Sequence, residues 1–458
     1  MKPFGRRDDP PPLALEPVPA RAASSSLVGA RNTQAQKTEK DPIERLRAKV
    51  LEQIDPSAAL DLTPIALFRQ LETLVHVVAS EDRLEITADD QARLAEDMAN
   101  DMLGLGPMER LLADDTINDI MVNGPDNVYV ERYGRLERVP VSFRDEGHIA
   151  LIAQRLAAAV GRRIDESSPM VDARLADGSR VNVIFPPIAI DSPIISIRKF
   201  ARYRLDFDAM VDNGTMSKQV ARLLEIAARA RLNIVVSGGT GSGKTTMLNA
   251  LSRLIDHGER LVTIEDTAEL LLQQPHVIRL ETRPANIEGK GEINQRDLVR
   301  NALRMRPDRI IVGEVRGVEA FDMLQAMNTG HDGSISTIHS NSSRDALTRI
   351  ENMVQMGSFG LPPQAIRQQI ASALDLIIHI ERQRDGVRRV MQLTEVHGME
   401  GDVITASDIA SFEYVGESRT GRIQGRYLIS GARPGFLARC EYFGLDRAWL
   451  EAVRGGGG

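Results

Sequence analysis

The chain has 458 residues, of which 42% are hydrophobic and 26% are charged, and its formal net charge is −7. This length exceeds what one hydrophobic core supports, so we expect several domains of a globular, water-soluble type. The single cysteine, Cys440, excludes an intramolecular disulfide framework and a cysteine-cluster zinc site, and it is typical of a reducing compartment. The negative net charge argues against a general nucleic-acid-binding protein.

The first hundred residues change character once. Residues 1–40 are rich in Pro, Ala, Ser and Arg without apolar periodicity, which predicts a disordered N-terminal tail. This start has no apolar core typical of a secretory signal, and no apolar run in the chain approaches the ~18 residues of a membrane span. Helical apolar spacing over residues 41–106, with Thr87 as a cap, predicts a helical bundle that breaks at Gly104–Pro107.

The remaining chain divides into three predicted parts. Residues 107–203 read as short strands with turns at Gly124–Pro125 and Tyr133–Gly134, and as one helix, which together indicate an α+β domain. Residues 204–400 alternate helices with apolar strands, the pattern of a parallel-sheet α/β domain. Residues 401–458 alternate weakly and are interpreted as a C-terminal subdomain with a flexible end.

A glycine-rich loop follows the apolar stretch "LNIVV" and precedes a predicted helix. It matches the pattern G-x-x-x-x-G-K-[ST] at Gly238, Gly243, Lys244 and Thr245. Glycines let backbone N–H groups face a bound anion, and the helix start adds a positive dipole end. Lys244 would reach the β- and γ-phosphates of ATP, and the Thr245 hydroxyl would ligate Mg²⁺. The predicted nucleotide-binding residues are Gly238, Gly239, Thr240, Gly241, Ser242, Gly243, Lys244, Thr245 and Thr246.

Two acidic positions follow later apolar strands. Glu314, in "RIIVGEV", can orient and deprotonate an attacking water from a strand end beside the γ-phosphate. The familiar Asp–Glu pair is Gly–Glu here, so the carboxylate on the Mg²⁺ side must come from elsewhere, and Glu265 in "VTIEDTAEL" can supply it. The alternative is that Glu265, Asp266 and Glu269 form a solvated acidic helix start.

Two histidines and three arginines are further candidates for the site. His331 and His339, in "TGHDGSISTIHS", could bind a metal, serve the structure, or sense the γ-phosphate. Arg174, Arg180 and Arg198 lie in the α+β domain before the glycine loop. They are either surface residues or a set that stabilises transition-state charge from another domain, as arginine fingers do.

Several segments together resemble the motor ATPases of secretion systems and type IV pili. Walker A, Asp box, Walker B and His box are matched by "GGTGSGKTT", "TIEDTAEL", "RMRPDRIIVGEVRG" and "TGHDGSISTIHSNS". With "LGPMERLLADDTINDIMVNGPDNVYVER", "ARLADGSRV", "ISIRKF" and "EVHGMEGDVI", the resemblance narrows to the Tad/Flp pilus assembly ATPases of the CpaF type. It covers about residue 100 to the end, and the segment 41–103 is similar to the all-α extension of that group.

This resemblance implies a PAS-like domain hinged to a RecA-like ATPase domain, with ATP and Mg²⁺ bound between them in a ring of six subunits. It implies that such a motor works at the cytoplasmic face of the inner membrane on a pilus platform protein, and that no nucleic acid is involved. General secretion members carry a four-cysteine zinc module, and a chain with only Cys440 departs from that branch.

The resemblance also implies roles for the individual residues. Glu314 matches the catalytic glutamate and Glu265 matches the acid near Mg²⁺. The histidines match the His-box pair, and the arginines match those that reach the nucleotide from the N-terminal domain.

Three other functions stay open at this stage. The first is an effector-secretion ATPase of a type IV or type II system. The second is a nucleic-acid translocase with a RecA-like core, and the third is a nucleotide-switched binding module that hydrolyses ATP poorly.

Overall fold

The computed structural model describes residues 42–54, 62–132, 134–200, 205–283, 285, 290–357 and 359–455. The predicted disordered tail, residues 1–40, lies outside these ranges. The described residues divide into two compact units, one up to Glu96 and one from Asp97 onward. Within the described ranges, no helix has both the length and the apolar character that a membrane crossing requires.

Helices make up the described part before residue 104. They are α1 (Pro42–Gln53), α3 (Pro64–Glu81) and α4 (Ala88–Leu103). The Thr63 hydroxyl caps α3 by accepting from the backbone N–H of Ala66, and the predicted cap Thr87 accepts from the N–H of Asp90. The apolar spacing of α3 buries Leu67, Leu71, Val75 and Val78. α4 ends at Leu103, as the glycine and proline of the following segment predict.

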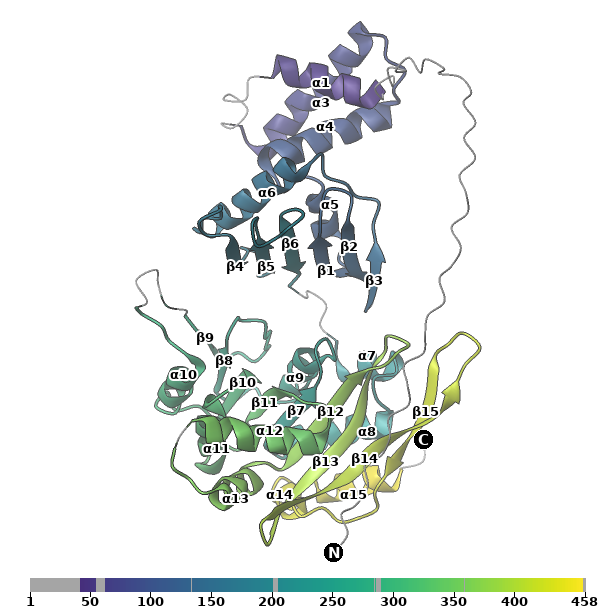
Figure 1. Cartoon of the computed structure of the whole chain (residues 1–458). Coiled ribbons are helices and arrows are strands. Elements are labelled where there is room, and N and C mark those ends of the chain that lie inside the picture. The colour runs from purple at the N-terminus through teal and green to yellow at the C-terminus, as the bar shows by residue number, and fades with distance from the viewer. Residues whose placement is uncertain are drawn as a thin grey trace, which may run out of the picture. The chain divides into compact units, whose positions relative to one another are not determined.

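The next part is an antiparallel sheet of six strands in the order β3-β2-β1-β6-β5-β4 (Figure 1). The strands are β1 (Ile117–Val122), β2 (Val128–Arg132), β3 (Arg135–Arg138), β4 (Met170–Arg174), β5 (Arg180–Ile184) and β6 (Ile194–Arg198), with helices α5 (Met108–Ala113) and α6 (Glu146–Ala159). Alternate residues of these strands pack against Ile149, Ile152 and Leu156 of α6 in one buried cluster. One face of this small sheet is therefore apolar and buried, and the other carries polar side chains.

The largest part is a nine-stranded sheet in the order β15-β14-β13-β12-β7-β11-β10-β8-β9. Its strands are β7 (Ile234–Gly238), β8 (Leu261–Glu265), β9 (Val277–Glu281), β10 (Arg309–Val315), β11 (Ile335–His339), β12 (Leu376–Arg382), β13 (Arg388–Glu400), β14 (Val403–Glu417) and β15 (Ile423–Ile429). The six strands from β12 to β9 are parallel, and β13, β14 and β15 continue the sheet antiparallel.

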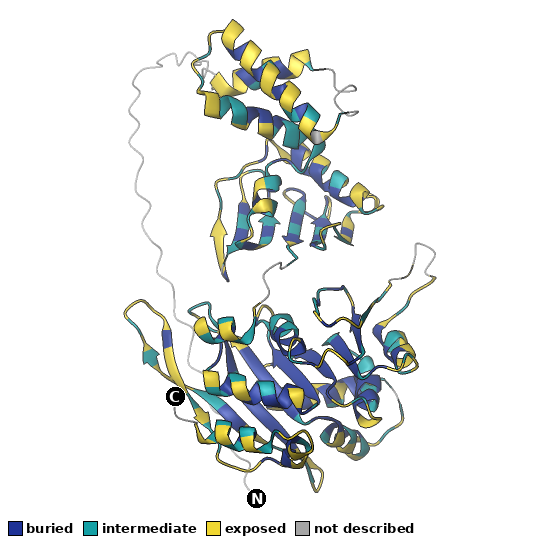
Figure 2. Cartoon of the chain, turned by 180° about the vertical axis from the view of Figure 1, so that it is seen from behind, coloured by how far each residue is buried: buried dark blue, intermediate teal, exposed yellow. Residues whose placement is uncertain are grey.

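Helices cover both faces of the large sheet (Figure 2). They are α7 (Phe207–Asp212), α8 (Lys218–Arg229), α9 (Lys244–Ser252), α10 (Gln295–Ala302), α11 (Glu319–Asn328), α12 (Ser343–Met356), α13 (Pro363–Ala373), α14 (Leu437–Tyr442) and α15 (Asp446–Arg454). Successive residues of β7 point into opposite cores: Ile234 and Val236 pack with α8 and α9, and Val235 packs with α11 to α13. Burial on both faces explains the continuous apolar runs in the sequence.

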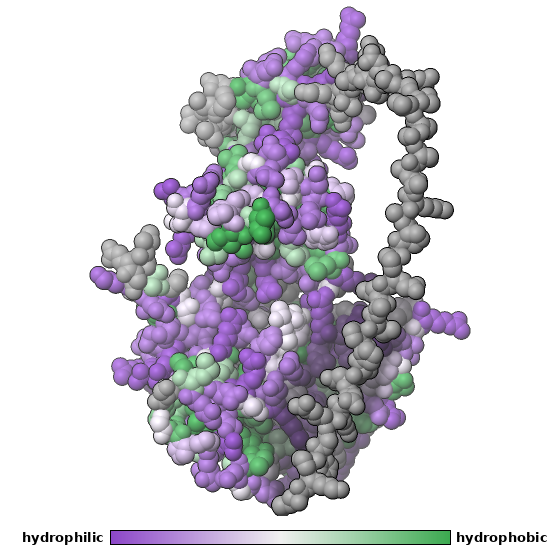
Figure 3. All heavy atoms as spheres, viewed as in Figure 1, coloured by the Kyte–Doolittle hydropathy of each residue, from purple (hydrophilic) through white to green (hydrophobic). Residues whose placement is uncertain are grey.

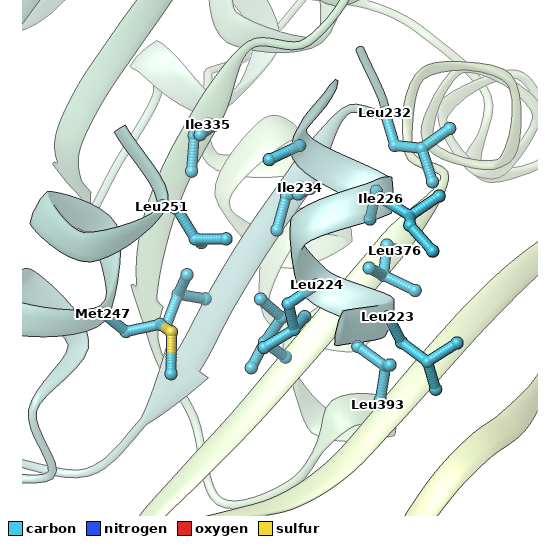
Figure 4. Close-up of a cluster of buried hydrophobic side chains, with 14 of the residues drawn as sticks. Leu223, Leu224, Ile226, Leu232, Ile234, Met247, Leu251, Ile335, Leu376 and Leu393 are labelled. Carbon is cyan, nitrogen blue, oxygen red and sulfur yellow. The ribbon is translucent and has the colours of Figure 1, made fainter. Parts of the chain in front are cut away.

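The core beneath α8 gathers residues from distant parts of the sequence (Figure 4). Leu223 and Leu224 of α8 join Ile234 of β7, Leu376 of β12 and Leu393 of β13 in one buried cluster. On the face shown in Figure 3, hydrophilic residues predominate and apolar residues form smaller separate patches. The mixed α/β class predicted from the sequence is confirmed, with two sheets and a parallel core consistent with a RecA-like domain.

The C-terminal residues complete the large sheet and its core. β13 and β14 pair across the predicted boundary at residue 400, so the first part of the predicted C-terminal subdomain is hydrogen-bonded to the large sheet. Trp449 of α15 is fully buried and packs edge-on against Phe436. Cys440 is a buried free thiol, and the described residues contain no cluster of metal-binding side chains.

Candidate functional site

The glycine loop connects the end of β7 to the start of α9. Gly243 precedes the helix with φ +98°, a left-handed conformation that favours glycine. A Cβ on Gly238 would lie 2.3 Å from the carbonyl oxygen of Ile380 on the neighbouring strand β12. Local conformation and close packing therefore both require glycine, and the loop leads directly into the positive end of a helix.

Lys244, the first residue of α9, lies over this loop. Its Nζ donates to the carbonyl oxygens of Gly238 and Gly239, each at 3.0 Å. The same Nζ lies 3.9 Å from Oε1 of Glu314. Burial lowers the pKa of Lys244, and the Glu314 carboxylate opposes that shift. Thr245 and Thr246 follow in the first turn and are half-buried.

Parallel strands bring the other candidate residues to the same edge of the sheet. Gly238 at the end of β7 pairs with His339 at the end of β11. Glu265 ends β8, and Glu314 is the penultimate residue of β10, the strand between β8 and β11. Because the carboxyl ends of parallel strands share one edge, these side chains gather beside the loop.

Glu265 is almost fully buried, with 3% of its surface exposed. Its Oε2 accepts hydrogen bonds from the backbone N–H groups of Glu269 at 2.7 Å and Leu270 at 2.8 Å. Its Oε1 is also buried and has no hydrogen-bond partner among the described residues. Burial raises the pKa of Glu265 to about 7, although the two backbone hydrogen bonds favour the ionised form.

An ion-pair network surrounds Glu314. Arg316 donates from Nε to Glu314 Oε2 at 2.8 Å, and its Nη2 contacts the same oxygen. Arg316 Nη1 lies 3.8 Å from the carboxylate of Asp266, and burial raises the pKa of Asp266. The sequence reasoning missed Arg316. The signal available was a cation two residues after the catalytic candidate, directly after the same strand.

The three predicted arginines lie in one row of the small sheet. Arg174, Arg180 and Arg198 are direct cross-strand partners on β4, β5 and β6, and the row continues through Asp119 on β1 to Glu131 on β2. Directly paired residues present their side chains on the same face of a sheet. This charged row therefore crosses the polar face, opposite the face that packs against α6.

Two of these arginines contact the segment that follows β8. Arg174 Nη2 donates to the carbonyl oxygen of Ala268 at 2.8 Å, and its Nη1 lies 3.2 Å from Glu281. Arg180 pairs with Glu269 at 3.2 Å, four residues after Glu265.

Arg198 pairs instead with Asp119 of its own sheet at 3.2 Å. The positive charge of Arg198 nevertheless acts on the glycine loop. Together with burial and the charge of Arg316, it lowers the pKa of Lys244.

The two histidines lie at opposite ends of strand β11, which is in the middle of the large sheet. His339 ends β11 beside the glycine loop, whereas His331 lies in the turn before β11, where its Nδ1 is 3.2 Å from the carbonyl oxygen of Ala326. The same turn donates from Gly333 and Ser334 to Asn233, at the start of β7. The length of β7, about 13 Å at ~3.3 Å per residue, therefore separates His331 from the loop within one chain.

A family model described as "Type II/IV secretion system protein" matches residues 101–429, more than half of the chain. The chain belongs to this family. The match includes the small sheet, the glycine loop and the strands up to β15, and so contains every candidate site residue named above.

Several known proteins and solved structures are similar to this chain. A putative conjugal transfer protein of Mycobacterium tuberculosis is 39% identical over 312 residues, which cover 67% of this chain and 88% of that protein. The crystal structure of the VirB11 ATPase from the Brucella suis type IV secretion system, in complex with sulphate, is 30% identical in sequence, with a TM-score of 0.34. The match covers 63% of this chain and 94% of that chain. The crystal structure of the pilus retraction motor PilT with bound ADP is 20% identical in sequence, with a TM-score of 0.46. The match covers 75% of this chain and 87% of that chain.

Proposed function

We propose that this chain is an ATPase that hydrolyses ATP to ADP and phosphate and converts the energy into movement of a membrane-associated assembly. The observation that carries the proposal is the position of Glu314 beside Lys244. An acid and a cation lie 3.9 Å apart at the edge of the sheet where a glycine loop opens a helix. This arrangement combines a binding site for phosphate groups with a base that can act on water.

Each residue at the edge has a distinct task in this proposal. The loop N–H groups and Lys244 bind the β- and γ-phosphates. Glu314 accepts a proton from the water that attacks the γ-phosphorus, so that the new P–O bond forms as the bond to ADP breaks. Arg316, paired with Glu314 at 2.8 Å, orients that carboxylate.

The residues at this edge fit a Mg²⁺ ion. Glu265 has one buried oxygen without a partner among the described residues, as expected of a carboxylate that awaits a cation. Thr245 follows Lys244 in the first turn of α9, where its hydroxyl would be the other protein ligand. Bound Mg²⁺ would neutralise phosphate charge in the transition state.

The arginine row is proposed to add positive charge to the same site. Arg174, Arg180 and Arg198 each pair with a carboxylate, at 3.2 Å in every case. An arginine that exchanges this carboxylate for a phosphate keeps charge-assisted hydrogen bonds in both states. Binding of the γ-phosphate would thus favour a movement of the small sheet toward the nucleotide. His339 and His331 are proposed as sensors of the γ-phosphate. His339 lies beside the glycine loop, whereas His331 lies in the turn at the other end of β11.

For the biological setting we propose a homohexameric motor of a Tad/Flp type IV pilus, at the cytoplasmic face of the inner membrane and acting on a platform protein. The four motifs support a motor of the secretion and type IV pilus group, and the resemblance of "LGPMERLLADDTINDIMVNGPDNVYVER", "ARLADGSRV", "ISIRKF" and "EVHGMEGDVI" supports the Tad/Flp type. A second candidate is an ATPase of conjugal transfer or effector secretion. It is favoured by the 39% identity over 312 residues to a putative conjugal transfer protein.

The test of ATPase activity is phosphate release by the purified chain with ATP and Mg²⁺. Lys244→Ala should abolish turnover and weaken nucleotide binding, whereas Lys218→Ala, an exposed lysine at the start of α8, should leave both unchanged. Near-normal turnover by Lys244→Ala would refute the assignment of the loop.

Cells that lack the chain distinguish the two settings. Loss of surface pili, restored by the wild-type chain but not by Lys244→Ala, supports the pilus motor. Loss of conjugation or secretion with normal pili supports the second candidate. Stimulation of turnover by DNA or RNA, with affinity that falls steeply with salt, would indicate a nucleic-acid translocase instead.

A further inference from the structure

The hairpin of β12 and β13 lies against the glycine loop. β12 is the parallel neighbour of β7, and Ile380 pairs with Gly238, the first glycine of the loop. Two residues later β12 ends at Arg382, and β13 begins at Arg388. The hairpin therefore turns just beyond the point where the loop leaves the sheet.

Two arginines of the hairpin lie against the loop. Arg388 donates from Nε to the carbonyl oxygen of Gly241 at 2.9 Å. Its Cδ would lie 3.1 Å from a Cβ on Gly243, and Nη1 of Arg382 would lie 3.8 Å from a Cβ on Gly241. The stem of Arg388 thus packs against the last glycine of the loop, and its guanidinium group binds a carbonyl near the centre.

The turn that carries these arginines is fixed by a buried ion pair. Arg389 donates from Nη1 and Nη2 to the two oxygens of Asp385, at 2.9 Å and 2.8 Å, and both side chains are only 4% exposed. Asp385 also accepts from the backbone N–H of Ile423 at 2.9 Å, which ties the turn to β15. Arg388 therefore extends from a rigid support, not from a free loop.

An acid of the small sheet faces the same two arginines. The Glu131 oxygens lie 3.5 Å from Nη2 of Arg388 and 3.6 Å from Nη1 of Arg382. Glu131 is only 16% exposed, and it is the last member of the charged row that contains Asp119 and Arg198. A carboxylate with this little access to water is screened less from its cations than an exposed one. The row thus ends beside Arg388, the residue that contacts the glycine loop.

We propose that Arg388 is a positioning residue for ATP binding, which holds the glycine loop open for phosphate, and that Glu131 controls how firmly it does so. Because the Gly241 carbonyl oxygen accepts from Arg388, the loop N–H groups stay free to face the phosphates. Glu131 anchors the other end of the guanidinium group. The small sheet thereby gains a connection to the phosphate site that is separate from the three predicted arginines.

The test measures KM and kcat for ATP in the full chain, and this inference rests on the proposed ATPase function. Arg388→Ala should raise KM about tenfold, the effect of losing one hydrogen bond from a charged donor, and change kcat less than threefold. Arg388→Lys keeps the charge but loses the planar fork, so its KM should be intermediate. Arg384→Ala is the matched control, because Arg384 lies in the same turn but pairs with Glu417 and Tyr414.

A double-mutant cycle tests the role of Glu131. Glu131→Gln should raise KM in the wild-type background and have no further effect together with Arg388→Ala. Equal effects in both backgrounds would show that Glu131 acts elsewhere. An unchanged KM in Arg388→Ala, or the same rise in Arg384→Ala, would overturn the inference as a whole.

Two further measurements separate this inference from the proposed function. If the wild-type chain shows no turnover, the proposed function fails, and the affinity for a fluorescent ATP analogue decides about Arg388. If Arg388→Ala does not fold, as judged by its melting temperature, Arg388→Lys and Glu131→Gln carry the same comparison.

Discussion

Gly313 and Glu265 share one space at the edge of the large sheet. A Cβ on residue 313 would lie 3.0 Å from Cγ and 3.6 Å from Cβ of Glu265. The two residues belong to neighbouring parallel strands, β10 and β8, and any side chain at 313 would press on the methylene groups of the buried Glu265 side chain. The Gly–Glu sequence, where Asp–Glu is familiar, thus has a steric reason: Glu265 from the next strand leaves little room for a side chain at position 313.

The first prediction follows from this contact. Gly313→Ala should displace Glu265 and lower ATP turnover at least tenfold, while overpacking costs about 1–3 kcal/mol of unfolding free energy. Turnover and urea denaturation measure the two effects. Gly416→Ala is the control, because a Cβ there meets nothing within 4 Å. Turnover in Gly313→Ala equal to that of Gly416→Ala would mean that the position of Glu265 has no importance for the reaction.

The second prediction separates the two acids. Glu314→Gln retains the size of the side chain and removes the base, so it should bind ATP and hydrolyse it about two orders of magnitude more slowly. Glu265→Gln removes the buried charge near the proposed metal and should raise the Mg²⁺ concentration that gives half-maximal turnover. Titrations of turnover against Mg²⁺ distinguish the variants. If Glu265→Gln lost turnover at every Mg²⁺ concentration and Glu314→Gln stayed active, the two roles would be reversed.

The third prediction concerns the arginine row. Arg180→Ala should lower kcat by tenfold or more without unfolding the chain, since it removes charge that is proposed to stabilise the transition state. Arg174→Ala and Arg198→Ala should act in the same direction. Arg163→Ala, an 85% exposed arginine that pairs with Asp165, is the control for a lost surface charge. Wild-type kcat in all three row variants would exclude the small sheet from the reaction.

The fourth prediction uses the buried pair of Asp385 and Arg389. Burial alone would raise the pKa of Asp385, but hydrogen bonds from Arg389, Ile423 and Val387 outweigh it and lower the pKa to about 2. A carboxyl group whose folded pKa lies below its ordinary 3.8 stabilises the fold above about pH 4. That contribution is lost as the pH falls from about 4 through about 2.

Asp385→Asn should therefore lower the free energy of unfolding by about 3 kcal/mol at pH 6, because it leaves Arg389 buried without its counter-charge. The difference between variant and wild type should shrink as the pH falls from 4 to 2. Urea denaturation across this range measures it, with Asp212→Asn, an exposed position, as the control. A difference that does not change with pH would show that the charge of Asp385 is unimportant.

Local patterns in the sequence were enough for most of the fold and for the centre of the site. The strand, loop and helix around Lys244 are contiguous, so apolar runs, glycines and the helix start predict them together. The parallel arrangement follows from the alternation of strands and helices, and it already places Glu265 and Glu314 at a common edge. The three arginines were placed on neighbouring strands from the sequence, and the structure has them as direct cross-strand partners.

Other relationships depend on the order and register of strands, which no local pattern contains. His331 and His339 are eight residues apart in one motif, yet strand β11 between them places one at each of its two ends. The contact of Gly313 with Glu265 requires β10 to lie beside β8, and that of Arg388 with Gly241 requires β12 to lie beside β7. Periodicity determines what each segment becomes, whereas only the packing of the whole sheet decides which side chains meet at its edge.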